Sequence, residues 1–313
     1  MAFDRTLAVA AAAAVIAMLA LASIESASAA VPGWTHTRMA NPARTQVTAS
    51  DGRWLATLTD GARTVTLAGP ERRLDEPSAA DPVITRVWVR ALDRPFDGHV
   101  DETWLADAMS TTQPDVLALA MGYLTDAPDK YDASGRRIAG DADYGPLQAD
   151  GTRQEGSDFN DFLGMDYAYG STVDRAESAQ IGSLDCSGFM RMVWGRRAGL
   201  KLTLAPNGAG IPRRSFEILA SAPGVVTIAN RAKQVTKLSK LAVGDLVFFD
   251  ASSSDGSQID HVGMYLGLDG AARPRFVSSR KTANGPTMGD VAGRSVLDGT
   301  GLYAKSLRAA RRL

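Results

Sequence analysis

The sequence predicts an α+β fold in which a helix that carries a cysteine packs on an antiparallel sheet. Apolar residues at 189, 190, 193 and 194 follow Cys186 at helical spacing. Three strand patterns come later in the chain, at 246–249, 262–266 and 275–277. Because the helix comes first and the strands follow it without alternating helices, we expect an antiparallel sheet with this helix on one face.

A small mixed, β-rich domain is expected ahead of this region, over residues 31–130. Residues 54–67 alternate around Asp60-Gly61, which is typical of a β-hairpin. A β-rich run and two stretches with helical spacing follow it, at 83–89, 102–109 and 114–124. Residues 31–50 are polar and are expected to be irregular. Nothing in this domain resembles a catalytic constellation, and its role is left open.

The segment between the two domains differs in composition from both. Gly, Asp, Arg and Gln dominate residues 131–160. So long a segment without a periodic pattern is usually a flexible connection or a functional flap. We therefore expect a polar linker or flap here, followed by a catalytic domain at 161–313, and a flap packed beside the cleft would shape substrate access.

The first 30 residues have the pattern of a signal peptide. Arg5 precedes an unbroken apolar run, 7–21, and Ala27-Ser28-Ala29 provides a small-x-small cleavage site. Asp4 offsets the charge of Arg5, which leaves an uncleaved anchor as the alternative. We expect a secreted or cell-wall-associated protein without stable membrane insertion after cleavage.

Composition and charge exclude several classes of protein. Apolar residues make up 45% and charged residues 22%, as in ordinary globular domains. Without residues 1–30 the chain holds 33 basic and 33 acidic residues, because that segment contains one of the 34 basic and two of the 35 acidic residues. With neither a basic stripe nor an aromatic platform, we expect no nucleic-acid partner. The basic run 305–313 would either attract anionic wall polymers or form a solvated last element with Leu307 and Leu313 packed inward.

Cys186 is the only cysteine, so the chain cannot form an internal disulfide. Asp185 or Ser187 can cap the helix that begins here, which places the thiol in the first turn. The unpaired N–H groups and the helix dipole there favour a thiolate and could also hold the oxyanion of a tetrahedral intermediate. The residue type and its position are typical of a nucleophile.

A thiolate nucleophile needs a group that exchanges a proton near neutral pH, and histidine is the natural choice. Among the three histidines, His36 and His99 lie in loop-like segments. The cluster of His99 with Asp101 and Glu102 fits no strong metal-ligand spacing, and we expect no metal and no cofactor. His261 begins an alternating strand whose 262, 264 and 266 positions are apolar, which predicts a buried face and leaves the imidazole at a shallow, accessible surface.

Four motifs resemble the NlpC/P60 cysteine peptidases and occur in the family's order. They are Tyr167-Ala168-Tyr169-Gly170, Asp185-Cys186-Ser187-Gly188, the strand at 243–249 and the strand at 260–267. The resemblance covers about residues 160–313. It implies a papain-like fold, no metal, and hydrolysis of amide bonds in peptidoglycan stem peptides, often between D-glutamate and the diamino acid.

The resemblance also implies roles for individual residues. Cys186 would attack the carbonyl carbon, and His261 would accept the thiol proton and later protonate the leaving amine. Tyr167 would line the cleft, and Asp185 and Ser187 would contact substrate, although helix capping explains both residues equally well. A Cys/His pair serves an amidase or acyltransferase as readily, and a catalytically inactive wall-binding protein is the alternative outside the enzymes.

The third catalytic residue departs from the family pattern. Members usually carry His, Asn, Gln or Glu at the end of the strand after the histidine strand, and here Ser278 stands at that position. A serine hydroxyl can accept the imidazole N–H but carries no charge and reaches less far. Either Ser278 orients His261, or Asn284 or another polar group from the following loop replaces it.

Overall fold

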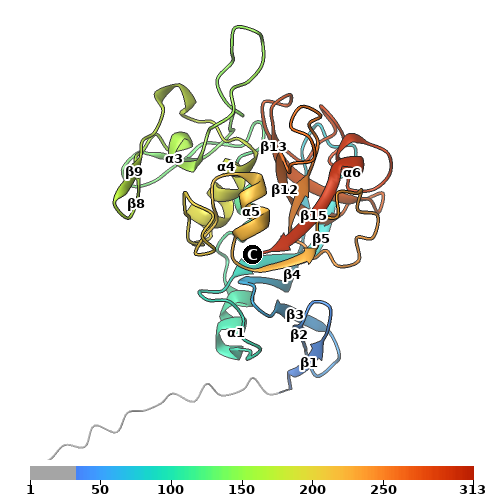
Figure 1. The fold of residues 1–313 in the computed structure, drawn as a ribbon. Coiled ribbons are helices and arrows are strands. Elements are labelled where there is room, and N and C mark those ends of the chain that lie inside the picture. The colour runs from blue at the N-terminus through green and yellow to red at the C-terminus, as the bar shows by residue number, and fades with distance from the viewer. Residues whose placement is uncertain (1–32) are drawn as a thin grey trace, which may run out of the picture.

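The computed structural model describes residues 33–313, in which two antiparallel sheets are joined by helices and long loops (Figure 1). The predicted signal peptide lies outside the described residues. The first sheet has strand order β1-β2-β3-β4-β5. Its strands are Thr35–Met39, Arg44–Thr48, Trp54–Thr59, Thr64–Leu74 and Val83–Ala91.

The predicted hairpin at Asp60-Gly61 is confirmed, because β3 and β4 pair antiparallel across it. The expectation that residues 31–50 are irregular was wrong. Residues 35–48 form β1 and β2, and in β2 the buried Thr45 and Val47 alternate with half-buried neighbours. Threonine and valine suit a pleated, half-buried surface, so a mostly polar segment can still complete a sheet.

The second sheet contains the strands predicted around the histidine. Its order is β10-β15-β11-β12-β13-β14, and every neighbouring pair is antiparallel. The bounds are Val225–Ile228 (β10), Leu246–Phe249 (β11), His261–Leu268 (β12), Pro274–Arg280 (β13), Gly285–Thr287 (β14) and Leu307–Arg312 (β15). The sequence predictions for β11, β12 and β13 are confirmed, and the chain is α+β as expected.

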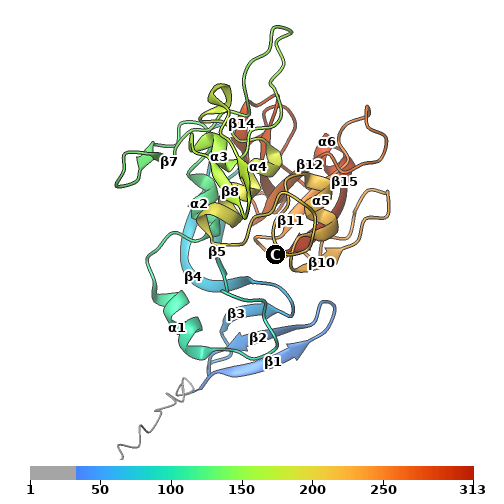
Figure 2. The same cartoon turned by 60° about the vertical axis from the view of Figure 1, so that its left-hand side comes forward.

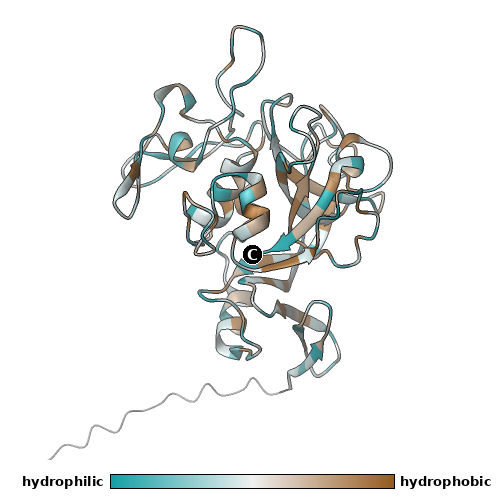
Figure 3. Cartoon of the chain, viewed as in Figure 1, coloured by the Kyte–Doolittle hydropathy of each residue, from teal (hydrophilic) through white to brown (hydrophobic). Residues whose placement is uncertain are grey.

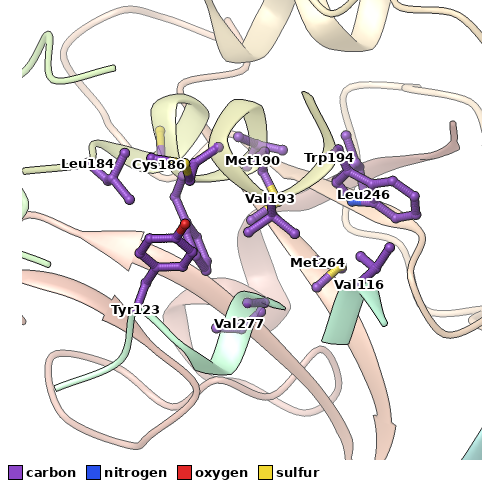
Figure 4. Packing of buried hydrophobic residues seen from close by; sticks show 14 of the residues in the cluster. Val116, Tyr123, Leu184, Cys186, Met190, Val193, Trp194, Leu246, Met264 and Val277 are labelled. Atoms are coloured by element: carbon purple, nitrogen blue, oxygen red, sulfur yellow. The ribbon is translucent and has the colours of Figure 1, made fainter. Parts of the chain in front are cut away.

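The cysteine helix packs on one face of this sheet, as Figures 1 and 4 show. It consists of α4, Cys186–Met190, continued by the π-helical turn η2, Arg191–Arg197. Its apolar side chains join Leu246, Met264 and Val277 in the largest buried cluster. In Figure 3 the strands beneath the helix are brown and the surrounding loops are mainly teal, as expected when apolar burial drives this packing. Helix α5, Ser215–Ser221, covers the neighbouring part of the sheet.

The N-terminal lobe has a small core of its own and also contributes residues to the large cluster beneath the cysteine helix. Helix α1, Glu102–Ser110, closes a small core of its own with the first sheet. Helix α2, Val116–Met121, and residues of β4 and β5 instead belong to the cluster beneath the cysteine helix. Figure 2 shows β4 and β5 passing from the lower lobe to the larger one. The domain limits at 130 and 160 stay predictions, but part of the region before residue 130 supports the cysteine helix.

The predicted linker contains ordered elements that pack on the larger lobe. Strands β6, Lys130–Tyr131, and β7, Arg137–Ala139, form a short hairpin. Beyond the hairpin, the carbonyl of Asp143 accepts a hydrogen bond from the Leu184 N–H at 2.8 Å, and Tyr144 is buried. The remaining short elements are α3 (Phe159–Phe162), β8 (Tyr167–Tyr169), β9 (Thr172–Asp174), the 3₁₀ turn η1 (Ser178–Gln180) and α6 (Leu302–Ser306).

The basic segment at 305–313 is not a solvated last element. Leu307 and Leu313 are buried as expected, but β15 runs between β10 and β11, and its arginines at 311 and 312 are buried too. The Arg312 guanidinium binds both oxygens of Asp245, at 2.7 and 2.9 Å, and donates to Thr59 of β3 at 2.7 Å. Arg312 thus joins the two lobes, whereas Arg311 donates to the carbonyls of Leu219, Ala222 and Gly224, and neither is available to a wall polymer.

No helix within residues 33–313 has the length and apolar character needed to cross a membrane.

Candidate active site

Cys186 is the first residue of α4 and lies almost completely buried, with 7% of its surface exposed. The Asp185 side chain caps the helix by accepting the Gly188 N–H at 2.8 Å. The sulfur lies 3.9 Å from the carbonyl oxygen of Asp260, and the backbone N–H of Val262 also points at it. The thiol therefore contacts the chain on both sides of His261.

His261 is the first residue of β12, and its ring packs among aromatic side chains. Its centroid lies 5.7 Å from that of Phe249 and 5.5 Å from that of Tyr303. The predicted apolar face of β12, at 262, 264 and 266, is buried as expected. The expectation of an accessible opposite face was wrong, because residues from β11, β13 and α6 form a second buried cluster there.

The sulfur and the imidazole meet at the beginning of β12 without a hydrogen bond between them in the described part of the chain. Cys186 belongs to the cluster beneath α4, and the His261 ring contacts the cluster on the other face. The sulfur lies against the backbone at 260–262, the stretch that carries His261. Catalytic hydrogen bonds are often long or misaligned before substrate binds, so this arrangement is compatible with a nucleophile and its base.

Both groups are held in their uncharged forms. Burial, and next the Asp185 carboxylate, raise the pKa of the Cys186 thiol to about 12. Burial, and next the positive charge of Arg280, lower the pKa of His261 to about 3. At neutral pH the resting pair is thus a thiol and a neutral imidazole, and not the thiolate that the helix position led us to expect.

Neither candidate for the third catalytic residue forms a hydrogen bond with the imidazole within the described chain. Ser278 is fully buried, and its hydroxyl accepts the Arg280 Nε–H at 3.1 Å. Asn284 donates to the Asp143 carboxylate at 2.6 Å and accepts the Tyr144 N–H at 3.3 Å. Within residues 33–313, His261 Nε2 is buried and has no hydrogen-bonding partner. The identity of the orienting residue stays a prediction.

Arg280 is the charged side chain that the structure places beside His261. Its guanidinium carbon lies 4.3 Å from the ring centroid of Tyr303, which itself packs on the imidazole. The guanidinium is buried and donates to the Ser295 hydroxyl and to the carbonyl of Gly293, but it forms no ion pair with a described carboxylate. A cation held in this way opposes a second positive charge on His261.

Replacing Arg280 with Met should raise the pKa of His261, although burial, the larger cause, will keep it below 6.5. Arg280→Lys keeps the charge and should leave the pKa low. Asp185 acts in the opposite sense and is unchanged in both variants, as are Cys186 and Tyr303. The measurement is an NMR titration of the imidazole, which is easily assigned because the chain has three histidines. A pKa that does not move in Arg280→Met would contradict the assigned cause.

Asp185 and Ser187 are both bound by a half-buried arginine, Arg213. Arg213 binds Asp185 at 2.7 Å, donates to the Ser187 hydroxyl at 2.7 Å and lies 3.7 Å from Asp158. Burial alone would raise the pKa of Asp185, but Arg213 and backbone N–H donors outweigh it and hold the pKa below its usual range. Asp185 caps the helix, and contact of Asp185 or Ser187 with substrate stays a prediction. Arg213 also offsets the repulsion between Asp185 and a thiolate.

Two tyrosines lie near the helix, and they have different surroundings. Tyr167 packs edge-on against Phe159 and Tyr169, at centroid distances of 4.9 and 4.8 Å, and lines a pocket of about 480 Å³ whose lining does not include Cys186. Tyr144 is 5% exposed, and its hydroxyl has no hydrogen-bonding partner in the described chain. Burial raises the pKa of Tyr144, and the negative charges of a Cys186 thiolate and of Asp185 raise it further.

Three carboxylates beside the site are the described group best placed to hold a cation. Oxygens of Asp250, Asp255 and Asp260 lie within 4.8 Å of one another. Asp250 pairs with Arg308 at 3.1 Å, and Asp260 accepts the backbone N–H groups of residues 251 and 252, both at 2.7 Å. Protein donors therefore already bind two of the three. The other sequence cluster is also in use, because Asp101 caps α1 and Glu102 binds His36 at 3.0 Å.

Comparisons with known proteins place part of the chain in a family. A family model described as "NlpC/P60 family" matches residues 164–290, which include Cys186 and His261. Four solved chains match, among them one from Staphylococcus aureus described as similar to a lipoprotein of the NLP/P60 family. That match has 22% identity and a TM-score of 0.26, and it covers 48% of the present chain and 36% of the other. No curated protein matches. The chain thus carries an NlpC/P60 family domain at residues 164–290.

Proposed function

We propose that this protein is a secreted cysteine peptidase that cleaves amide bonds in peptidoglycan stem peptides, at the bond between D-glutamate and the diamino acid. The observation that carries the proposal is the placement of the Cys186 sulfur at a helix N-terminus, against the backbone on both sides of His261. The family domain supports the substrate class, and the predicted signal peptide supports secretion.

The reaction begins with the transfer of the thiol proton to His261. The sulfur forms a bond to the scissile carbonyl carbon, and the electron pair of the carbonyl moves to its oxygen. Backbone N–H groups at the start of α4 and the Tyr144 hydroxyl are the donors available to that oxygen. His261 then returns the proton to the leaving amine, the C–N bond breaks, and water releases the peptide from the acyl-enzyme.

The buried, neutral pair opposes charge separation before substrate binds, because the pKa of Cys186 is about 12 and that of His261 is about 3. The thiol becomes a good nucleophile only as its proton leaves, so deprotonation by His261 must be coupled to attack on the carbonyl. The oxyanion donors then stabilise the negative charge as it forms.

The test is incubation of the chain lacking residues 1–30, and of its Cys186→Ala variant, with purified peptidoglycan and soluble stem peptides. Mass spectrometry of the products should show fragments cut after D-glutamate only with the wild type, and the variant should lose at least about 10³-fold in rate. Products with a new amide bond in place of hydrolysis would indicate an acyltransferase. Equal yields from both proteins, or none from a wild type whose thiol is inert to iodoacetamide, would refute the proposal.

A further inference from the structure

A pocket of about 590 Å³ lies beside β10, and its walls come from residues 226–240. Four cationic side chains line it, Arg231, Lys233, Lys237 and Lys240, and no acidic side chain does. All four are exposed, and none forms an ion pair with a described residue. We call this pocket the cationic pocket.

The segment that forms the cationic pocket is anchored to the sheet. The Val235 N–H donates to the carbonyl of Leu307 at 3.0 Å, and Val235 and Leu238 pack on the aromatic cluster beside His261. The Gln234 side chain donates to the carbonyl of Gly299 at 3.3 Å. These contacts hold the charged residues around one cavity, at an electrostatic cost that a bound anion would relieve.

Thr227 of β10 also lines the pocket, but its side chain is buried and its hydroxyl is inaccessible within the described residues. The exposed cations are therefore the groups that can contact a ligand. The volume is within the range of ordinary ligand sites.

We propose that the cationic pocket binds an anionic glycan polymer of the cell wall, through phosphate or carboxylate groups along that polymer. Spaced cations match repeated charges, and the aliphatic parts of the walls suit sugar rings. A single-stranded nucleic acid would need stacking surfaces, and no aromatic side chain lines this pocket. The choice of a wall polymer rests on the proposed function, and the preference for a polyanion rests on the charges alone.

Such binding would keep the enzyme on its insoluble substrate. The pocket and the thiol lie in one continuous fold, because β10 pairs with β15 and β15 pairs with β11, which leads into β12. A polymer held at β10 would therefore raise the local concentration of stem peptides without touching the reacting atoms.

The experiment measures binding of the chain lacking residues 1–30 to purified sacculi that keep their anionic polymer and to sacculi stripped of it. Lys233→Glu/Lys237→Glu is compared with Lys130→Glu/Arg175→Glu, which reverses two exposed cations elsewhere. The pocket variant should lose at least about tenfold in affinity for intact sacculi, the control should change less than twofold, and stripping should remove the difference. Wild-type binding should weaken steeply with salt.

Soluble probes identify the charged group and separate this proposal from the catalytic one. Inorganic polyphosphate and a polyuronate are tested as competitors for sacculus binding, and they distinguish phosphate from carboxylate. The affinity of the pocket variant for the probe that competes should be at least tenfold lower than that of the wild type. Equal losses in both double variants, or tighter binding of single-stranded DNA than of either probe, would overturn the proposal. Cys186→Ala should bind sacculi normally, and the pocket variant should cleave soluble stem peptides normally, so either proposal can fail alone.

Discussion

Replacing His261 with Ala should lower kcat/KM for stem-peptide cleavage by about 10³-fold or more, because the variant loses the group that accepts the thiol proton. Burial raises the pKa of Cys186 to about 12, so without a nearby base very little thiolate exists at neutral pH. The measurement is the cleavage rate of a defined stem peptide across pH. Alkylation of the thiol by iodoacetamide should fall as well, and more at pH 7 than at pH 9.5, where hydroxide can replace the missing base.

The matched control for this prediction is His36→Ala. His36 binds Glu102 in the first lobe at 3.0 Å and has no contact with the site. The kcat/KM of His36→Ala should stay within about twofold of the wild-type value, because a substitution far from the site is not coupled to it. A loss of less than tenfold in His261→Ala would contradict the assignment of His261 as the base.

Replacing Arg312 with Leu should lower the free energy of unfolding by about 3 to 5 kcal/mol, because the Asp245 carboxylate would be left buried without its partner. The same change removes the hydrogen bond to Thr59 that joins the lobes. Urea unfolding followed by circular dichroism measures the effect. Arg53→Leu is the control, since Arg53 and Asp51 are both largely exposed and 3.7 Å apart, and no measurable change is expected.

A double variant separates the ion pair from the packing around it. Asp245→Asn together with Arg312→Leu removes both charges, so its loss should be smaller than the sum of the two single losses. Losses that add fully, or a change below about 1 kcal/mol in Arg312→Leu, would show that this pair does not hold the lobes together.

The features of the site that could be predicted from the sequence are those that depend on short, local patterns. A cysteine after a capping residue, followed by helical spacing, and a histidine at the start of an alternating strand depend on neighbours within a few residues. The structure has the cysteine helix on the sheet and β11, β12 and β13 at the expected places. The signal peptide and the assignment of catalytic roles stay predictions.

The missed part depends on contacts between residues far apart in the chain. Arg213 reaches Asp185 from 28 residues away, and Tyr144 lies in a segment whose composition indicated only a linker. Arg280 follows Ser278 in the same strand and so faces the same side, but its position under Tyr303 required α6 to fold back. A buried charge leaves no periodic signal in a sequence, because it is one residue whose partners come from other elements.

The position of β15 has a consequence for how the protein reaches its final form. The last strand in the sequence lies between two strands that precede it, and the main-chain oxygen of Leu313 accepts hydrogen bonds from Arg63 and Thr64 at 2.8 and 2.7 Å. Until residues 307–313 leave the ribosome, β10 and β11 lack the strand that lies between them, and Arg312 is not yet bound to Asp245 and Thr59. The larger sheet can therefore close only after its other five strands have been made, through contacts of very long sequence separation.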